Sequence, residues 1–240
     1  MHSLDNVIWT ALTTSQAHLG IVCRKARKFH KDVSLLAAFP DPSEEAYDSL
    51  AGLVDAGERV GLFLQGEPNA PPNWKIVASI PLLQMLYEKG NLPPETANIA
   101  DDIHPLGEAD VPEMLALTKL TRPGPFGTRT HEMGEYYGIR KEGMLVAMAG
   151  ERLRLPGFTE ISAVCTHPEH LGHGYARQLI ALLLERIQRR GERAFLHVRE
   201  DNARAVQLYE RMGFRTRLLR QYALLSKVSN PPLRLTPVIA

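Results

Sequence analysis

One segment of this 240-residue chain constrains its fold more than any other: an apolar strand, a glycine-rich loop and a long amphipathic helix follow one another. The pattern predicts the strand over residues 160–166, the loop over 167–174 and the helix over 175–190, with Gly191 ending the helix. Glycines between a strand and a helix let backbone N–H groups approach one point, beside the positive end of the helix dipole. The segment therefore predicts an α/β fold with a site for phosphate oxygens.

Two well-known phosphate-binding loops are excluded because the chain lacks their sequence motifs. The chain contains no Gly-Lys-Ser or Gly-Lys-Thr, which the nucleoside-triphosphate loop requires. The dinucleotide-binding loop needs glycine or alanine at position 177, where this chain has Arg177. The glycines alone do not identify a ligand, because glycine also serves ordinary tight turns.

A second motif follows the next predicted strand, residues 194–199. It reads N-A-R-A-V-Q-L-Y-E-R-M-G-F over residues 202–214 and is typical of a helix that Gly213 ends. Together with V-C-T-H-P and L-G-H-G-Y-A upstream, this motif resembles the cofactor half of the GNAT N-acyltransferase superfamily. The resemblance is specific over residues 160–214 and looser over residues 102–226.

The resemblance implies that acetyl-CoA is the cosubstrate, without a metal, and that an acetyl or other acyl group passes directly to an amine in a ternary complex. It also implies that the strand end pairs with the pantetheine arm and that loop N–H groups hold the pyrophosphate. The implied cofactor residues are Val164, Cys165, Thr166, Leu171, Gly172, His173, Gly174, Tyr175, Ala176, Arg177 and Asn202. Leu171 departs from the family pattern, which favours Arg or Gln there, and a non-catalytic acyl-CoA-binding or regulatory module is the alternative function.

Two residues are predicted to be catalytic. The resemblance points Tyr209 at the acyl-CoA sulfur, where a phenol of pKa about 10 can protonate a leaving thiolate of pKa about 8.5. A backbone N–H near Val164 or Cys165 would stabilise the oxyanion of the tetrahedral intermediate. The amine must lose a proton, and Glu160 is the candidate base because superfamily members often place a Glu on this strand. The alternatives are a core-packed helix residue for Tyr209 and a solvated strand end for Glu160.

Three histidines and a cysteine suggest two further interpretations. His167, His170 and His173 recur at every third position, which would suit a metal site, although structural sites usually have four ligands. Loop histidines beside an anionic cofactor are the preferred interpretation. Cys165 could carry the acyl group covalently, but no base is fixed nearby in the sequence, so a small buried strand residue is the preferred interpretation.

The acceptor pocket is expected at the loop over residues 121–130, where GNAT proteins usually shape it. Arg122 and Arg129 could bind a substrate carboxylate, and Tyr137 with Tyr136 could line the same pocket. Surface solvation and strand packing are the alternatives for these side chains. The acceptor itself stays open among amino acids, polyamines, aminoglycosides and protein N-termini.

The whole chain is predicted to be α/β, or α+β, with a mixed, mostly antiparallel sheet that is splayed where the cofactor enters. A GNAT domain is expected over residues 102–228, a smaller N-terminal α/β domain over residues 1–95 and a tail over residues 229–240, with Asn91–Asp101 as the boundary. One interpretation of the N-terminal part is a degenerate GNAT-like half without the glycine loop. Within it, Pro81–Glu88 is expected to be a short helix.

Composition narrows the function classes. Lys and Arg number 28 against 27 Asp and Glu, and this balance argues against a nucleic-acid-coating or membrane-surface protein. No apolar stretch reaches the length of a membrane span, and the first residues carry no secretion signal. Two cysteines form no disulfide framework, which favours a reducing cytoplasm. We therefore expect a cytoplasmic enzyme that acts on a small-molecule or peptide amine. Its oligomeric state stays open, with a homodimer as the commonest case.

Overall fold

The structure, a computed structural model, describes residues 2–88 and 103–228. The expected domain boundary Asn91–Asp101 and the expected tail over residues 229–240 lie outside the described residues. Among those described, no helix is long and apolar enough to cross a membrane.

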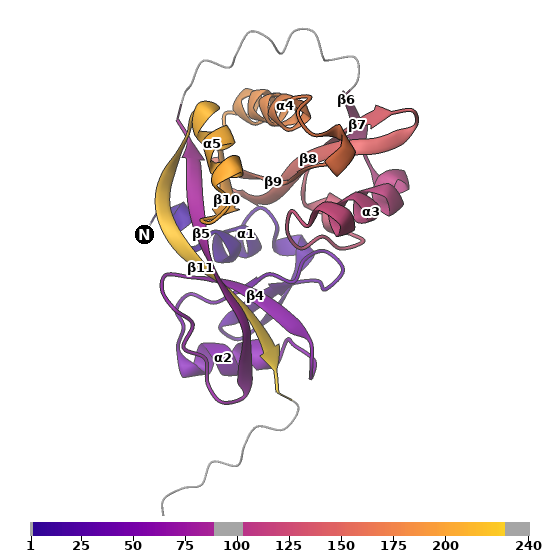
Figure 1. The fold of residues 1–240 in the computed structure, drawn as a ribbon. Coiled ribbons are helices and arrows are strands. Elements are labelled where there is room, and N and C mark those ends of the chain that lie inside the picture. Colours follow the sequence, from indigo (N-terminus) through magenta and orange to yellow (C-terminus); the bar gives the residue numbers. More distant parts are fainter. Residues whose placement is uncertain (1, 89–102, 229–240) are drawn as a thin grey trace, which may run out of the picture.

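An eight-stranded sheet organises the molecule (Figure 1). Its strands are β4 (Arg59–Leu64), β5 (Trp74–Tyr87), β6 (Ile103–Leu106), β7 (Tyr136–Lys141), β8 (Met144–Leu155), β9 (Phe158–Thr166), β10 (Arg193–Arg199) and β11 (Phe214–Lys227). Their order across the sheet is β4-β11-β5-β10-β9-β8-β7-β6, and every neighbouring pair is antiparallel except β9 and β10. The mixed, mostly antiparallel sheet that the sequence predicts is therefore confirmed.

Helices pack on both faces of this sheet. The α-helices are α1 (Val7–Thr13), α2 (Glu44–Ala51), α3 (Val111–Thr121), α4 (Tyr175–Arg189) and α5 (Ala203–Arg211). Short 3-10 turns cover Ser3–Asn6, Ala17–Leu19, Glu108–Asp110, Thr130–Met133 and Pro168–His170. Side chains alternate along β10, so Leu196 and Val198 join the core under α4 and α5, while Phe195 joins the core around α1.

The long helix α4 forms where the sequence predicts it, because its apolar residues recur at three- and four-residue intervals. Leu179, Leu183 and Ile187 lie on one side of the helix and are fully buried against the sheet. This packing holds the helix start, and the glycine loop before it, at the upper end of the sheet (Figure 1).

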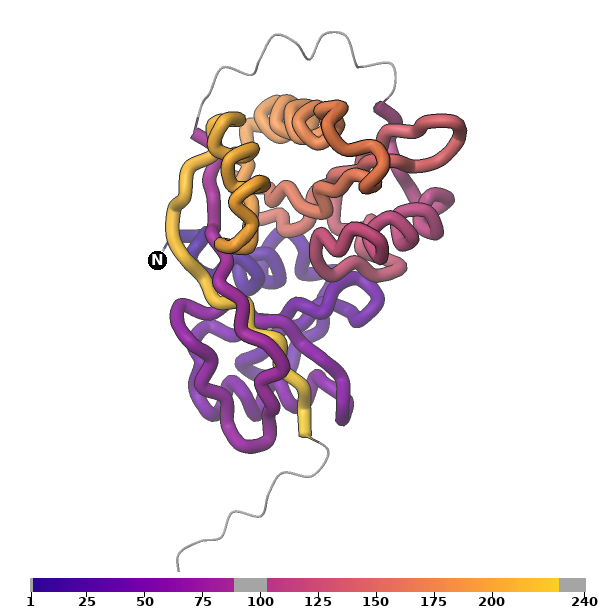
Figure 2. Tube along the Cα trace, in the orientation of Figure 1, coloured from indigo at the N-terminus to yellow at the C-terminus, as the bar shows by residue number. Residues whose placement is uncertain are grey.

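The N-terminal segment adds a small three-stranded antiparallel sheet. Its strands are β1 (Gly20–Cys23), β2 (Ala26–Phe29) and β3 (Ala37–Ala38). Leu36 pairs with Gly61 of β4 in an isolated parallel bridge, which joins the small sheet to the large one. β11, from the end of the chain, lies between β4 and β5, and the traces of β5 and β11 run side by side (Figure 2). Strands from both expected domains therefore belong to one sheet.

Residues 81–87 form part of β5 and not the short helix expected over Pro81–Glu88. β11 pairs with these residues on one side, and β10 pairs with Leu82–Leu86 on the other. Pro81 is tolerated because its carbonyl accepts a hydrogen bond (3.1 Å) from the N–H of Glu200, just beyond β10. The reciprocal bond, from position 81 to the Glu200 carbonyl, is missing because proline has no N–H, but it would lie beyond Arg199, the last paired residue of β10. Pairing on both sides overrides the local preference.

Candidate active site

A cleft opens where β9 and β10 separate. The two parallel strands pair at three positions, the last being Phe195 with Glu160, and no pairing joins them beyond that point. Residues 164–166 of β9 line one wall of the cleft and residues 197–199 of β10 line the other. The cleft has a volume of about 960 Å³. The sheet is thus splayed at the strand that the sequence analysis singles out.

Two β-bulges in the ladder between β8 and β9 shape this wall. At the first, residues 163–164 oppose Ala149 alone, and Ala163 has a left-handed backbone with a φ of 53°. At the second, residues 152–153 oppose Glu160 alone. A bulge leaves one residue out of the ladder. The first bulge therefore makes backbone N–H available where the sequence predicts the oxyanion, and the second redirects β8 where the splay begins.

The glycine loop leads directly into the start of α4. Gly172 and Gly174 have φ values of 87° and 76°, in the region that favours glycine. The helix's first backbone hydrogen bond runs from the N–H of Gln178 to the carbonyl of Gly174, at 3.2 Å. The N–H groups at the helix start have no intrahelical partner, and with the helix dipole they form a site for phosphate oxygens.

Most of the predicted cofactor residues meet at this cleft. Its lining includes Val164, Cys165, Thr166, Leu171, Gly172, Gly174, Tyr175, Ala176, Arg177 and Asn202. His173 is outside the lining: its ring stacks on that of Tyr175 with centres 5.4 Å apart, and its Nδ1 lies 3.2 Å from the His170 carbonyl. Asn202 also caps α5, because its side-chain oxygen accepts a hydrogen bond (3.2 Å) from the N–H of Ala205.

Tyr209 faces the same cleft from α5. Its buried ring lies edge-on to Phe214, with 5.9 Å between the ring centres. Burial, with a smaller effect of the nearby Cys165 thiol, raises the pKa of Tyr209 to about 12, so the phenol stays protonated at neutral pH and can donate. Burial also raises the pKa of Cys165 to about 11 against the opposing effect of a hydrogen bond with Thr121, which disfavours a thiolate nucleophile.

Glu160 lies behind the cleft wall and is outside the lining. Arg152 donates to it twice, and Nδ1 of His197 lies 2.6 Å from its Oε1. Nε2 of His197 faces the amide nitrogen of Gln84 at 3.2 Å, while the Gln84 oxygen accepts from Arg217, so Nδ1 carries the proton of a neutral ring. Burial opposes ionisation of Glu160, but Arg152 and His197 outweigh it and lower its pKa to about 2. A carboxylate held in this way is a poor base, so its geometry suits a positioning role and not the proton transfer expected of it.

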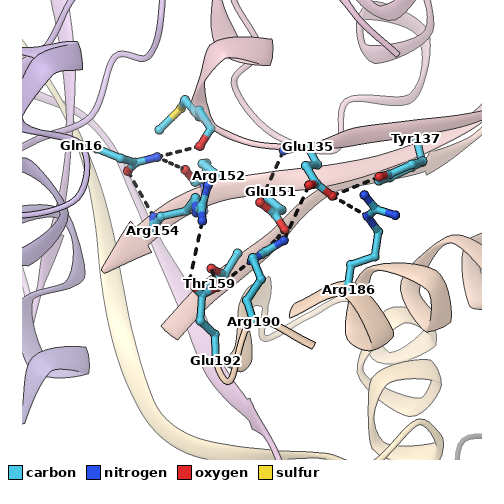
Figure 3. Close-up of polar contacts among 11 residues, drawn as sticks. Gln16, Glu135, Tyr137, Glu151, Arg152, Arg154, Thr159, Arg186, Arg190 and Glu192 are labelled. Atoms are coloured by element: carbon cyan, nitrogen blue, oxygen red, sulfur yellow. Dashed lines mark hydrogen bonds and ion pairs between the residues drawn. The ribbon is translucent and has the colours of Figure 1, made fainter. Parts of the chain in front are cut away.

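The three predicted acceptor residues are not brought together. Arg122 lines the cleft, whereas Arg129 is exposed and forms an ion pair at 2.6 Å with a glutamate three residues further on. The hydroxyl of Tyr137 donates to Glu135 at 3.0 Å, and the guanidinium of Arg186 lies over its ring at 5.1 Å (Figure 3). Arg129 and Tyr137 therefore serve contacts outside the cleft.

A buried glutamine ties the N-terminal segment to the strand that carries Arg152 (Figure 3). Nε2 of Gln16 donates to the carbonyls of Met133 and Arg152, at 2.9 and 2.7 Å. Its Oε1 accepts from the N–H of Arg154 at 3.2 Å. Gln16 thus satisfies backbone groups on both sides of the bulge at residues 152–153.

Two arginines and two aromatic residues are among the lining residues that sequence reasoning missed. Arg204 and Arg211 line the cleft from α5, and their seven-residue spacing, close to two helical turns, was an available signal. Phe63 and Tyr222 line it from β4 and β11. No local pattern connects these two, because their strands come from opposite ends of the chain.

The three loop histidines lie near one another. The ring centres of His167 and His170 are 5.8 Å apart, and those of His170 and His173 are 6.4 Å apart. Within residues 2–88 and 103–228, no group of three or more His, Cys, Asp or Glu is placed to hold a metal ion.

Comparison with known proteins decides the family. The model of the family described as FR47-like protein matches residues 136–223. A crystal structure of a Novosphingobium aromaticivorans protein assigned to the GNAT acetyltransferases is 36% identical, with a TM-score of 0.87. That match covers 95% of this chain and 100% of the other. The chain belongs to the GNAT family.

Two further relatives of this GNAT protein are named as acetyltransferases. Mycothiol acetyltransferase from Brachybacterium faecium is 34% identical over 111 residues, which cover 44% of this chain and 34% of the relative. The N-alpha-acetyltransferase RimI from Mycobacterium tuberculosis is 41% identical over 91 residues, which cover 36% of this chain and 56% of the relative. The matches thus span about a third and about half of these relatives.

Proposed function

We propose that this GNAT protein transfers an acetyl group from acetyl-CoA to an amine by direct attack in a ternary complex. The observation that carries the proposal is the meeting of the glycine loop, the bulged strand β9 and Tyr209 in one cleft. The loop offers N–H groups to the pyrophosphate, and the free edge of β9 offers backbone groups to the pantetheine arm. Tyr209 lines the same cleft from α5, and we assign it to the leaving sulfur.

The reaction needs two groups from this chain. As the amine nitrogen bonds to the thioester carbon, the carbonyl electron pair moves to oxygen, and a backbone N–H near Val164 or Cys165 stabilises that oxyanion. The intermediate then collapses, the carbon–sulfur bond breaks, and Tyr209 donates its proton to the leaving thiolate. Solvent reprotonates the phenol.

The attacking nitrogen must be uncharged, and it loses a further proton when the amide forms. In the described part of the chain, no carboxylate lines the cleft. Both oxygens of Glu160 are engaged by Arg152, and one of them also by His197. We infer that water takes these protons in place of Glu160.

Calorimetric titration of acetyl-CoA into the purified protein tests the proposal, followed by amine-dependent thiol release. We expect saturable binding, weakened in Gly174→Glu because a larger, charged side chain would occupy the loop at a left-handed φ. Binding without thiol release for any amine would indicate the non-catalytic acyl-CoA-binding module. Absence of binding would overturn the proposed function.

A further inference from the structure

The cleft extends beyond the residues assigned to acyl-CoA into a region that we call the acceptor end. It is lined by Leu36, Phe63, Ile80, Leu82, Arg152 and Tyr222. The ring centre of Phe63 lies 4.5 Å from that of His197 and 6.0 Å from that of Tyr222. The Arg152 guanidinium lies 5.9 Å from the same Phe63 ring. The acceptor end is thus an apolar, partly aromatic surface around one largely buried cation.

The acceptor end lies at the start of the splay, away from the phosphate loop. Arg152 bonds to Glu160, where β9 last pairs with β10, and the loop begins only after Thr166. The strand between these two points spans about 20 Å, since each residue rises about 3.3 Å. β4, which carries Phe63, accordingly lies in the lower half of Figure 1, away from α4 and α5. The phosphates of the cofactor therefore do not occupy this region.

The N-terminal half of the chain shapes the acceptor end. Tyr222 packs directly on the backbone of β4 because residue 61 is glycine. An added Cβ at Gly61 would lie 2.7 Å from Cε2 of Tyr222 and 2.9 Å from its hydroxyl oxygen. Phe63, two residues further along, presents its ring on the same side of the strand. Any other residue at position 61 would displace the Tyr222 ring.

The charges along the cleft are of one sign. Within the described ranges, six arginines and no aspartate or glutamate line it. Nε and Nη2 of Arg152 already donate hydrogen bonds to Glu160. The guanidinium of Arg122 forms no ion pair or hydrogen bond with the residues that the structure describes. Its neighbour Thr121 lines the same cleft as Cys165, on the strand where the acyl group would lie, and acts to lower the pKa of that thiol against the larger effect of burial.

These charges discriminate between classes of amine. A second ammonium group on an acceptor would meet guanidinium groups and apolar surface, with no carboxylate to offset its desolvation. A carboxylate on the acceptor could bind the guanidinium of Arg122, because arginine is the side chain best suited to bind a carboxylate with two hydrogen bonds. An apolar substituent would find Phe63, Ile80 and Leu82.

We propose that the acceptor is a monoamine that carries an apolar side chain and a carboxylate, the chemistry of a free apolar amino acid. Arg122 binds its carboxylate, and Phe63 and Tyr222 contact its side chain. This inference rests on the proposed function. It narrows the acceptor to one class of amine, so polyamines and aminoglycosides are not expected to be acetylated.

Matched amines test the inference with the full-length protein and acetyl-CoA. L-phenylalanine is compared with 2-phenylethylamine, and L-leucine with 3-methylbutylamine, which differ only in the carboxylate. Phenylalaninamide, spermidine and kanamycin complete the panel. We expect kcat/KM to be about 10- to 100-fold higher for the carboxylate-bearing member of each pair, the range of a hydrogen bond to a charged group.

Two variants in the loop over residues 121–130 test whether Arg122 causes the preference for carboxylate-bearing amines. Arg122→Gln should bring the ratio within each pair close to one, because kcat/KM should fall more for the carboxylate-bearing amine than for its decarboxylated partner. Arg129→Gln removes a guanidinium from the same loop but outside the cleft, and it should keep the wild-type ratio.

Several outcomes overturn the inference. These are equal kcat/KM within the pairs, faster acetylation of spermidine or kanamycin, a preference for phenylalaninamide over L-phenylalanine, and an unchanged ratio in Arg122→Gln. If acetyl-CoA binds but no amine of the panel is acetylated, the acceptor inference fails while the cofactor site stands. If acetyl-CoA does not bind, the proposed function fails and this inference falls with it.

Discussion

Arg152 holds Glu160 at two points, with Nε donating to Oε2 at 2.8 Å and Nη2 donating to Oε1 at 2.6 Å. The Glu160 side chain is 0% exposed and that of Arg152 is 13% exposed. The pair lies at the β8 bulge and at the last position where β9 and β10 are hydrogen-bonded. The sheet therefore opens beside a buried ion pair between β8 and β9, whose carboxylate also contacts His197 of β10.

Acid should weaken the fold through this pair. Although burial raises the pKa of Glu160, Arg152 and His197 lower it further, to about 2 from an ordinary value of 4.5. A carboxyl whose pKa is lowered by folding stabilises the fold above pH 4.5 and loses that contribution as the pH falls towards 2. We expect urea titrations to show the free energy of unfolding falling across this window.

The variant Glu160→Gln tests whether Glu160 causes this pH dependence of stability. At pH 7 the substitution should cost about 3–5 kcal/mol, because Arg152 becomes a buried cation without a counter-ion. The fall in stability below pH 4.5 should shrink in this variant, and the double variant Arg152→Met, Glu160→Gln should recover part of the loss. An acid profile identical to that of the wild type would contradict the assignment.

Tyr209→Phe should lower kcat by about 100-fold, because the leaving thiolate loses its proton donor. The Kd for acetyl-CoA should change little, since the ring and its edge-on contact with Phe214 remain. Thiol release and calorimetry measure the two quantities separately. Tyr137→Phe is the matched control: its hydroxyl bonds to Glu135 outside the cleft, and kcat should be unaffected. Equal kcat in both variants would remove Tyr209 from the mechanism.

Gly172→Ala should weaken acetyl-CoA binding. The residue has a φ of 87°, so alanine there costs about 1–2 kcal/mol of backbone strain or shifts the loop that presents its N–H groups. Gly191→Ala provides a control with the same kind of strain, since Gly191 has a φ of 73° at the far end of α4. Both variants should lose stability in thermal unfolding, but only Gly172→Ala should lose affinity in calorimetry.

Gln16→Ala should destabilise the protein by at least about 2 kcal/mol, because it strips hydrogen bonds from buried backbone groups that each cost about 1–3 kcal/mol when unsatisfied. The loss concerns the backbone at the β8 bulge, so we also expect a raised KM for the amine acceptor. Gln188→Ala, an exposed glutamine on α4, should change neither quantity. Chemical denaturation and steady-state kinetics check both expectations, and equal stability of the two variants would contradict them.

Tyr136→Phe should leave stability unchanged or raise it. The Tyr136 hydroxyl is buried without a hydrogen-bond partner among the described residues, and an unsatisfied buried hydroxyl costs about 1–3 kcal/mol. The ring keeps its edge-on contact with Phe126, at 5.6 Å between centres. A clear fall in melting temperature would instead reveal a partner for the hydroxyl.

The sequence by itself determined the parts of this protein that depend on short-range geometry. Gly172 and Gly174 adopt the positive φ that their place between a strand and a helix requires, and Leu179 with Leu183 gives α4 its buried side. The family resemblance rests on these same local spacings, which is why it is visible without coordinates. Local chain geometry is enough here, because each of these features needs only residues a few positions apart.

Only the tertiary structure decided which of the candidate side chains meet. Arg122 lines the cleft while Arg129, seven residues on, lies outside it, and residues 81–87 become a strand because β10 and β11 pair with them from both sides. From the sequence, Glu160 is expected to be a free carboxylate. In the structure, a bulge places Arg152 opposite Glu160, and burial strengthens the ion pair between them. These outcomes depend on contacts between residues far apart in the chain and on the loss of water around them, which no local pattern encodes.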